Sequence, residues 1–235
     1  MARQVKSRQR VADHGEVFTA EREVKAMCDL VRQETERIDS RFLEPACGDG
    51  NFLAEILVRK LEIVKLKYRR SAYDWERNSL LALGSIYGVD ILADNCQICR
   101  DRLFDIWNKE YKKVCKKECN DDTREAAKFI LLRNIVCGNA LTLYCVDDDG
   151  NDTTVPIIFS EWTFPRNDAF IHRKDYTFAE LVNAADSPKK KKSGPEQMTL
   201  QLDTSESDDE ADEGIFIQEY VSHYRRLADE AEDTE

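Results

Sequence analysis

A short apolar segment that runs into a glycine turn and then into a helical pattern is the feature that most constrains this chain. Residues 41–44 are typical of a strand, the turn follows over residues 45–50, and apolar residues recur at helical spacing over residues 52–65. Gly48 and Gly50 allow a tight backbone turn, and the helix that follows offers free amide groups at its first turn. The segment therefore predicts an α/β fold with a ligand held against the main chain after the first strand.

Further strands and helices alternate after this turn. Residues 86–91 form an apolar run with Asp90 near its end, residues 135–139 end at Asn139, and residues 155–159 form a fourth strand. Apolar residues at helical spacing predict helices over residues 21–36, 52–65, 79–85, 95–111 and 124–132, with a polar loop over residues 69–78. This alternation predicts right-handed crossovers and a doubly wound, mostly parallel sheet of the Rossmann-like type, in which the strand ends meet at one edge.

The acidic charge lies mainly at one end of the sequence. The net charge is -11, and residues 203–235 hold 13 acidic and 2 basic residues, so residues 1–202 are neutral overall. The acidity therefore does not exclude a body that contacts DNA. We expect one domain over residues 1–185, a disordered linker over residues 186–214, and a short C-terminal element with an acidic tail over residues 215–235.

Two further sequence features concern location and metals. The chain has no run of about 18 apolar residues and no apolar signal sequence, which predicts a cytoplasmic protein without a membrane span. Cys96, Cys99, Cys115 and Cys119 approach the spacing of a four-thiolate zinc site. The first two also fit the buried face of an amphipathic helix as small core residues, and we favour that interpretation without excluding zinc.

Acidic residues around the glycine turn narrow the class of ligand. Glu44 and Asp49 would repel a pyrophosphate, and the third glycine of the dinucleotide fingerprint is missing. Asp90, at the end of the next strand, stands where a carboxylate can accept both hydroxyls of a ribose. A nucleoside with a cationic group and no phosphates, such as S-adenosylmethionine, fits this set better than NAD.

In this order the motifs resemble those of class I S-adenosylmethionine-dependent methyltransferases, and among them the adenine-N6 DNA methyltransferases of restriction-modification systems with the gamma motif order. Residues 15–20 resemble the motif that covers the methionine end of the cofactor, residues 42–53 the glycine motif, residues 87–91 the ribose motif and residues 138–141 the adenine motif. The resemblance implies cofactor contacts from Phe18, Thr19, Glu44, Pro45, Ala46, Cys47, Gly48, Asp49, Gly50, Asn51, Phe52, Asp90, Ile91, Asn139, Ala140 and Leu141.

The catalytic motif departs from the family pattern. Such enzymes carry Asn-Pro-Pro-Tyr or a close variant after the fourth strand, whereas residues 159–165 are Phe-Ser-Glu-Trp-Thr-Phe-Pro here. The resemblance implies catalytic positions at Ser160, Glu161 and Trp162, with Ser160 accepting a hydrogen bond from the target amine and Trp162 stacking on a flipped adenine. About 70 residues follow, fewer than the roughly 100 of an autonomous target-recognition domain, so we expect a partner subunit to recognise the DNA sequence.

The leading hypothesis is therefore the methyltransferase subunit of a restriction-modification or phage-related system, which modifies adenine N6 in DNA. The alternative is a non-catalytic methyltransferase-fold subunit that binds cofactor or DNA and regulates a catalytic partner. A methyltransferase acting on RNA or protein is a third reading, because the fold does not fix the substrate. Gln197–Leu202 also loosely resembles the peptides by which bacterial DNA enzymes bind the sliding clamp.

Overall fold

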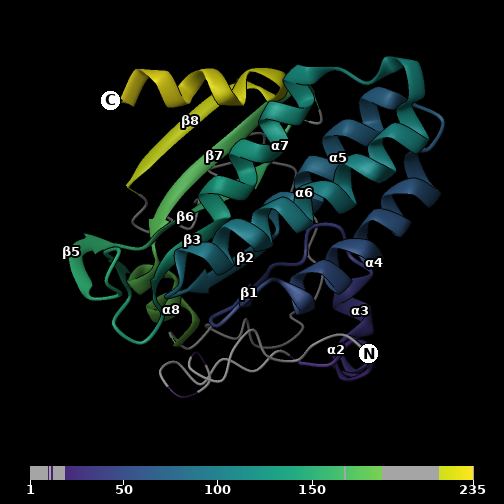
Figure 1. Cartoon of the computed structure of the whole chain (residues 1–235). Helices are drawn as coiled ribbons and strands as arrows, with labels where there is room; N and C mark the ends of the chain where they lie inside the picture. Colours follow the sequence, from purple (N-terminus) through teal and green to yellow (C-terminus); the bar gives the residue numbers. More distant parts are fainter. Residues whose placement is uncertain (1–9, 11, 13–18, 167, 187–216, 235) are drawn as a thin grey trace, which may run out of the picture.

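The computed structural model of the chain describes residues 10, 12, 19–166, 168–186 and 217–234 (Figure 1). Phe18, most of the predicted linker and the clamp-like peptide 197–202 lie outside these described residues. The helices are α2 (Glu21–Leu30), α3 (Arg32–Thr35), α4 (Asn51–Tyr68), α5 (Ala72–Gly84), α6 (Ala93–Cys115), α7 (Asp121–Asn134) and α8 (Phe178–Asp186), with 3-10 helices η1 (Lys116–Glu118) and η2 (Tyr224–Thr234). None of the helices in this described part is long and apolar enough to cross a lipid bilayer.

The strands form two sheets. The first has five strands in the order β1 (Phe42–Glu44), β2 (Ile86–Asp90), β3 (Ile135–Asn139), β4 (Tyr144–Val146) and β5 (Asp152–Pro156). The second has three antiparallel strands, β6 (Ile158–Thr163), β7 (Phe170–Thr177) and β8 (Gln218–His223). The protein is thus an α/β fold with a mixed five-stranded sheet and helices.

The sheet is less parallel than the sequence predicts. The pairs β1–β2 and β2–β3 are parallel, but β3–β4 and β4–β5 are antiparallel, because the chain turns back through Leu143 (φ 69°) instead of entering a helical crossover. Asp147 closes the β4–β5 turn by accepting hydrogen bonds from the amides of Asp149 and Asn151 at 3.0 and 2.9 Å. The predicted parallel strand over residues 155–159 is wrong: it is divided between β5 and β6.

Two helices rather than one fill each crossover between parallel strands. α4 and α5 join β1 to β2, and α6 and α7 join β2 to β3, and the four helices pack against one another as a bundle beside the sheet (Figure 1). The loop predicted over residues 69–78 is wrong, because Ser71 caps α5 by accepting a hydrogen bond from the Asp74 amide at 3.2 Å. Glu76 and Arg77 in this helix are buried although they are charged, so the apolar periodicity that would predict a helix is interrupted there.

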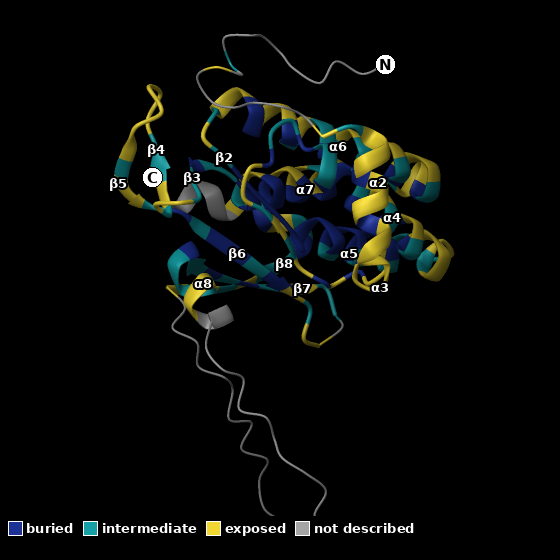
Figure 2. Cartoon of the chain, turned by 90° about the horizontal axis from the view of Figure 1, so that it is seen from below, coloured by how far each residue is buried: buried dark blue, intermediate teal, exposed yellow. Residues whose placement is uncertain are grey.

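Aromatic side chains fill the core of the helical bundle. The rings of Trp75 on α5 and Tyr111 on α6 stack at 5.5 Å with 7° between their planes. Trp107 packs against both rings, and its indole donates to Ser79 Oγ at 2.9 Å. The buried residues in Figure 2 accordingly follow the strands and the inner helices, whereas α2 faces outward.

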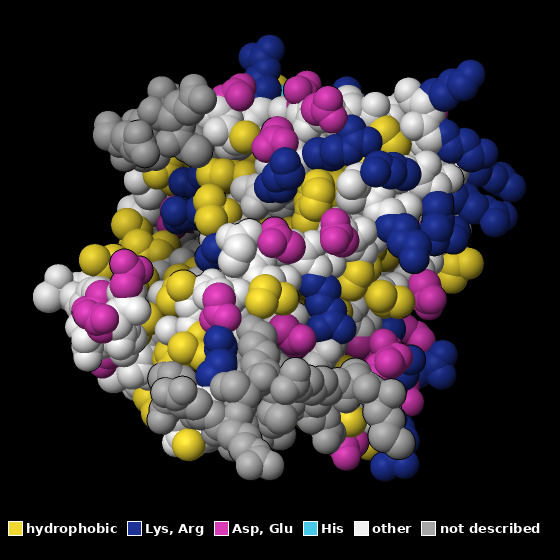
Figure 3. All heavy atoms as spheres, in the orientation of Figure 1, with side chains coloured by type: hydrophobic (Ala, Val, Ile, Leu, Met, Phe, Trp, Pro, Cys, Tyr) yellow, Lys and Arg dark blue, Asp and Glu magenta, His cyan; other side chains and the backbone are white. Residues whose placement is uncertain are grey.

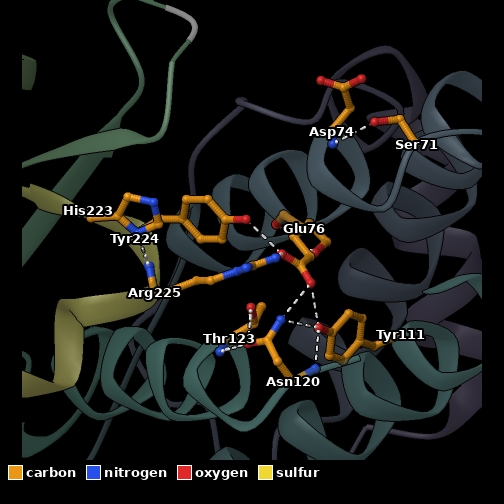
Figure 4. Close-up of polar contacts among 10 residues, drawn as sticks. Ser71, Asp74, Glu76, Tyr111, Asn120, Thr123, His223, Tyr224 and Arg225 are labelled. Atoms are coloured by element: carbon orange, nitrogen blue, oxygen red, sulfur yellow. Dashed lines mark hydrogen bonds and ion pairs between the residues drawn. The ribbon is translucent and has the colours of Figure 1, made fainter. Parts of the chain in front are cut away.

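A buried carboxylate joins the C-terminal segment to this core (Figure 4). Glu76 is fully buried and accepts hydrogen bonds from the hydroxyl groups of Tyr111 and Tyr224, from Asn120 Nδ2 at 3.1 Å and from Arg225 Nη2 at 2.7 Å. β8 adds a further six paired positions along β7. Within the predicted C-terminal element 215–235, the described residues 217–234 therefore belong to the same packed unit as the helices.

Candidate cofactor site

The glycine turn lies at the carboxyl end of β1 and its conformation favours glycine. Gly48 and Gly50 have φ values of 52° and 81°, in the left-handed region. The Cys47 amide donates to Val89 O at 2.9 Å, which ties the turn to β2. A Cβ at Gly50 would lie 2.6 Å from Cys99 Sγ, so the turn approaches α6 too closely for any side chain there.

Asp90 links the ends of the first two strands. Its Oδ2 accepts a hydrogen bond from the Gly48 amide at 2.9 Å, across 42 residues of sequence. Its Oδ1 accepts from the Leu92 amide at 2.9 Å and from Asn95 Nδ2 at 3.3 Å. Because a carboxylate oxygen can accept two hydrogen bonds, Oδ2 retains one acceptor position for a ligand hydroxyl.

Charged groups surround the turn on its helix side. Arg102 of α6 donates to Asn51 Oδ1 at 2.7 Å and lies 3.5 Å from Asp49 Oδ1. That Asp49 oxygen is buried and accepts no hydrogen bond among the described residues. Burial raises the pKa of Glu44, and a hydrogen bond to the Ala46 backbone acts in the opposite direction. Asp49 is thus paired with Arg102, whereas Glu44 forms no ion pair among the described residues and favours a cationic over an anionic ligand.

The first turn of α4 adds hydrogen-bond donors to the same place. Gly50 occupies its N-cap position and supplies no side-chain cap, although its carbonyl accepts from the Ala54 amide at 2.8 Å. The early amides of a helix have no partner within the helix. They are therefore open to a ligand at the amino end of α4, next to the glycine turn.

The third loop contributes less than the sequence predicts. Asn139 donates to Asp152 Oδ1 at 3.1 Å and accepts from the Leu141 amide at 3.0 Å, so its side chain is engaged in the β4–β5 region. Leu141 is 94% exposed, and Ala140 packs against the cluster around Val89. Thr19 is exposed, and Ile91 lies beside Asp90. The structure thus gathers residues 44–52 with Asp90 and Ile91, and leaves Leu141 in solvent.

The three predicted catalytic residues do not join this site. β6 runs from the carboxyl edge of the sheet to its amino edge: a Cβ at Gly138 would lie 2.6 Å from Ile157 Cδ1, and a Cβ at Gly84 would lie 2.8 Å from Trp162 Cδ1. Gly138 precedes the last residue of β3, whereas Gly84 lies just before β2. Ser160, Glu161 and Trp162 consequently lie toward the edge opposite the glycine turn.

Burial and bonding explain what these residues do instead. Ser160 is fully buried; its hydroxyl donates to Asp175 Oδ1 at 2.6 Å and accepts from Arg133 Nε at 3.2 Å. Trp162 is 3% exposed, and its indole donates to Asn134 Oδ1 at 3.1 Å. Glu161 pairs with Arg41 at 3.2 Å beside a cavity of about 270 Å³. A tryptophan in this position joins the core and presents no ring face to a base.

The zinc pattern is also not assembled. Cys96 and Cys99 lie in the first turns of α6, and Cys115 is its last residue, about 28 Å further along at 1.5 Å per residue. In the described part of the chain no group of three or more His, Cys, Asp or Glu side chains is arranged to hold a metal ion. Cys99 and Cys96 instead pack beneath the glycine turn, which the sequence signalled only through their spacing on the buried face of a helix.

No protein family model matches the chain, and the searches of curated proteins and of solved structures find no match either. The methyltransferase resemblance therefore rests on the motifs in the sequence.

Proposed function

We propose that this chain binds S-adenosylmethionine between the glycine turn and Asp90, as a subunit of a DNA adenine-N6 methyltransferase in a restriction-modification or phage-related system. The observation that carries the proposal is the contact between the Gly48 amide and the Asp90 carboxylate, because it brings the glycine motif and the ribose motif to one place. In this proposal β1 to β3 and their crossovers are the cofactor half of a Rossmann-like, doubly wound fold.

The residues at this edge suit the cofactor chemically. S-adenosylmethionine supplies a methyl group on a cationic sulfonium, and it carries no phosphate. Glu44 favours a cation over a pyrophosphate. Asp90 Oδ2 has an acceptor position for a ribose hydroxyl, and the left-handed glycines leave the main chain open to a ligand.

Target recognition is assigned to a partner subunit. Ser160 and Trp162 are buried at the opposite edge, so neither grips an adenine beside the cofactor turn. We therefore propose that a second chain supplies the groups that hold the flipped base as well as those that read the DNA sequence. The present chain contributes the cofactor.

Calorimetric titration with S-adenosylmethionine tests the cofactor assignment. We expect binding to the wild type and to Asp105→Asn, which removes an exposed carboxylate from α6, and no binding of NAD. Asp90→Asn should weaken binding by about tenfold or more, because a hydrogen bond to a charged group contributes about 1.5–3 kcal/mol. Circular dichroism of each variant checks that it is folded, and the absence of heat with the folded wild type would refute the proposal.

Transfer of a labelled methyl group into DNA, measured with and without copurifying proteins, tests the enzyme assignment. The alternative is that the chain only regulates a catalytic partner, and the burial of Trp162 favours it. Under the leading proposal Asp90→Asn lowers transfer by the complex by about tenfold or more when S-adenosylmethionine is limiting. Under the alternative the complex carrying that variant keeps its activity.

A further inference from the structure

The end of the helical bundle where α4 and α6 finish is strongly basic. Residues 65–70, where α4 ends, carry four Lys or Arg and no acid, and residues 109–118, where α6 and η1 end, carry five Lys and two Glu. Lys65 Nζ lies 3.5 Å from Glu110 Oε2, so the two stretches are neighbours. We call residues 65–70 and 109–118 the basic helix end. Figure 3 shows Lys and Arg side chains gathered along the right-hand side of the molecule, over the helices.

Most of these cations are available to a ligand. Glu110 pairs with Lys65 and Lys113, but seven other cations are exposed and form no ion pair with a carboxylate among the described residues. These seven are Lys67, Arg69, Arg70, Lys109, Lys112, Lys116 and Lys117. Cations in the last turn of a helix interact favourably with the helix dipole. That effect is confined to the last turn and does not account for so many cations.

Hydrogen bonds fix the backbone just after these lysines, at Asn120 (Figure 4). Asn120 follows η1 and caps α7 by accepting from the Thr123 amide at 2.8 Å. Its own side chain donates to the buried Glu76, and its amide donates to the Tyr111 hydroxyl at 3.0 Å. The connection between α6 and α7 is therefore tied to the core, and the lysines project from a fixed support.

We propose that the basic helix end binds the phosphate backbone of a double-stranded nucleic acid without reading its sequence. Lysine and arginine contacts to phosphates supply sequence-independent affinity by releasing counterions. A protein interface of useful strength has a buried apolar centre, whereas Leu66 is the one large apolar side chain here that is mostly exposed in the described structure. Phosphate binding needs no such centre, and this favours nucleic acid over an acidic protein.

This surface is separate from the cofactor edge. α4 runs for 18 residues from the glycine turn to the basic helix end, about 27 Å at 1.5 Å per residue. That length corresponds to about eight base pairs at 3.4 Å each. The inference goes beyond the proposed function, since it concerns a second contact that does not depend on methyl transfer.

Fluorescence anisotropy with a labelled 30-base-pair DNA duplex, in the absence of S-adenosylmethionine and over a salt titration, tests the inference on the full chain. Two triple variants remove six of the seven exposed cations: Lys67→Gln with Arg69→Gln and Arg70→Gln, and Lys112→Gln with Lys116→Gln and Lys117→Gln. We expect each to weaken binding by about tenfold or more at 100 mM salt and to lower the logarithmic salt slope by about 0.9 for each phosphate that the variant no longer neutralises.

A third triple variant is the matched control. Arg22→Gln with Arg166→Gln and Arg226→Gln removes three exposed cations that form no ion pair with a carboxylate within the described structure and that lie outside the basic helix end. We expect duplex binding by this control to stay within about twofold of the wild type. Equal losses in all three variants, or no loss in the first two, would overturn the inference, and so would binding of polyglutamate in place of the duplex.

The same variants separate this inference from the proposed function. Calorimetry should show unchanged S-adenosylmethionine binding by both basic triples, because neither touches the glycine turn. A chain that fails to bind the cofactor but has weaker duplex affinity in the basic triples would refute the proposed function and leave the inference standing. The reverse result would refute only the inference.

Discussion

Gly50 and Gly150 have almost the same φ, 81° and 82°, but different surroundings. A Cβ at Gly50 meets Cys99 Sγ at 2.6 Å, whereas one at Gly150 meets nothing within 4 Å. We expect Gly150→Ala to lower the free energy of unfolding by about 1 kcal/mol through backbone strain alone. Gly50→Ala should lower it by about 2–4 kcal/mol, since overpacking adds to the strain. Urea denaturation measures both, and equal losses would contradict the crowding under the turn.

The burial of Lys60 on α4 should make the free energy of unfolding depend on pH. Its ammonium group is fully buried and donates to Ile38 O at 3.0 Å, to Ser85 Oγ at 2.7 Å and to Ser40 O. Burial lowers the pKa of Lys60 from 10.5 to about 7. Between these two values the unfolded chain binds the proton and the folded chain does not, so this group makes stability rise with pH across that window.

The variant Lys60→Met removes this contribution. The free energy of unfolding of the wild type, minus that of the variant, should increase by about 1.4 kcal/mol per pH unit between pH 7 and 10. Urea denaturation at several pH values supplies the difference and cancels groups common to both proteins. A flat difference would mean that the three oxygen acceptors keep the buried ammonium charged.

At the scale of elements, removing one hydroxyl group tests how strongly the C-terminal segment is bound to the core. Tyr224 donates to Glu76 Oε2 at 2.7 Å, whereas the Tyr220 hydroxyl on β8 makes no hydrogen bond among the described residues. We expect Tyr224→Phe to lower the free energy of unfolding by about 1.5–3 kcal/mol, because its acceptor is charged and buried. Tyr220→Phe should change it by less than about 0.5 kcal/mol. Similar losses from both variants would show that the Glu76 contact contributes little.

The sequence predicted those elements whose pattern is local. β3 over Ile135–Asn139 agrees residue for residue, and the predicted helix over residues 95–111 lies within α6. Apolar periodicity and the glycine turn suffice for these elements. The start of α5 was missed because Glu76 and Arg77 are buried charges, which no local pattern announces.

Part of the candidate site could likewise be predicted from the sequence, and part could not. Gly48 and Asp90 were predicted to meet, because the ends of parallel strands share an edge, and the 2.9 Å contact between them agrees. The positions of Ser160 and Trp162 could not be read from their own segment. They depend on Gly84 and Asn134, which lie far away in the sequence and face β6 only once the helices have packed.

At the scale of the whole molecule, the return of the chain to β8 predicts that the fold survives a cut. A protease site placed between Gly194 and Pro195 separates residues 217–234 from the rest without breaking any described element. Six paired positions between β7 and β8 and the Glu76 contacts should keep the two fragments together. Size-exclusion chromatography after cleavage should show one peak at the position of the intact protein, and separate fragments would contradict the arrangement.

The buried Glu76 also bears on how this protein is made. Its partner Arg225 follows it by 149 residues, so at roughly 5–20 residues per second a ribosome needs roughly 7–30 seconds to supply the guanidinium. An unpaired carboxylate stays in water because burying it is costly. Until residues 224 and 225 are synthesised, Glu76 has only Tyr111 and Asn120 as donors, so we expect the core around the stacked rings of Trp75 and Tyr111 to close last.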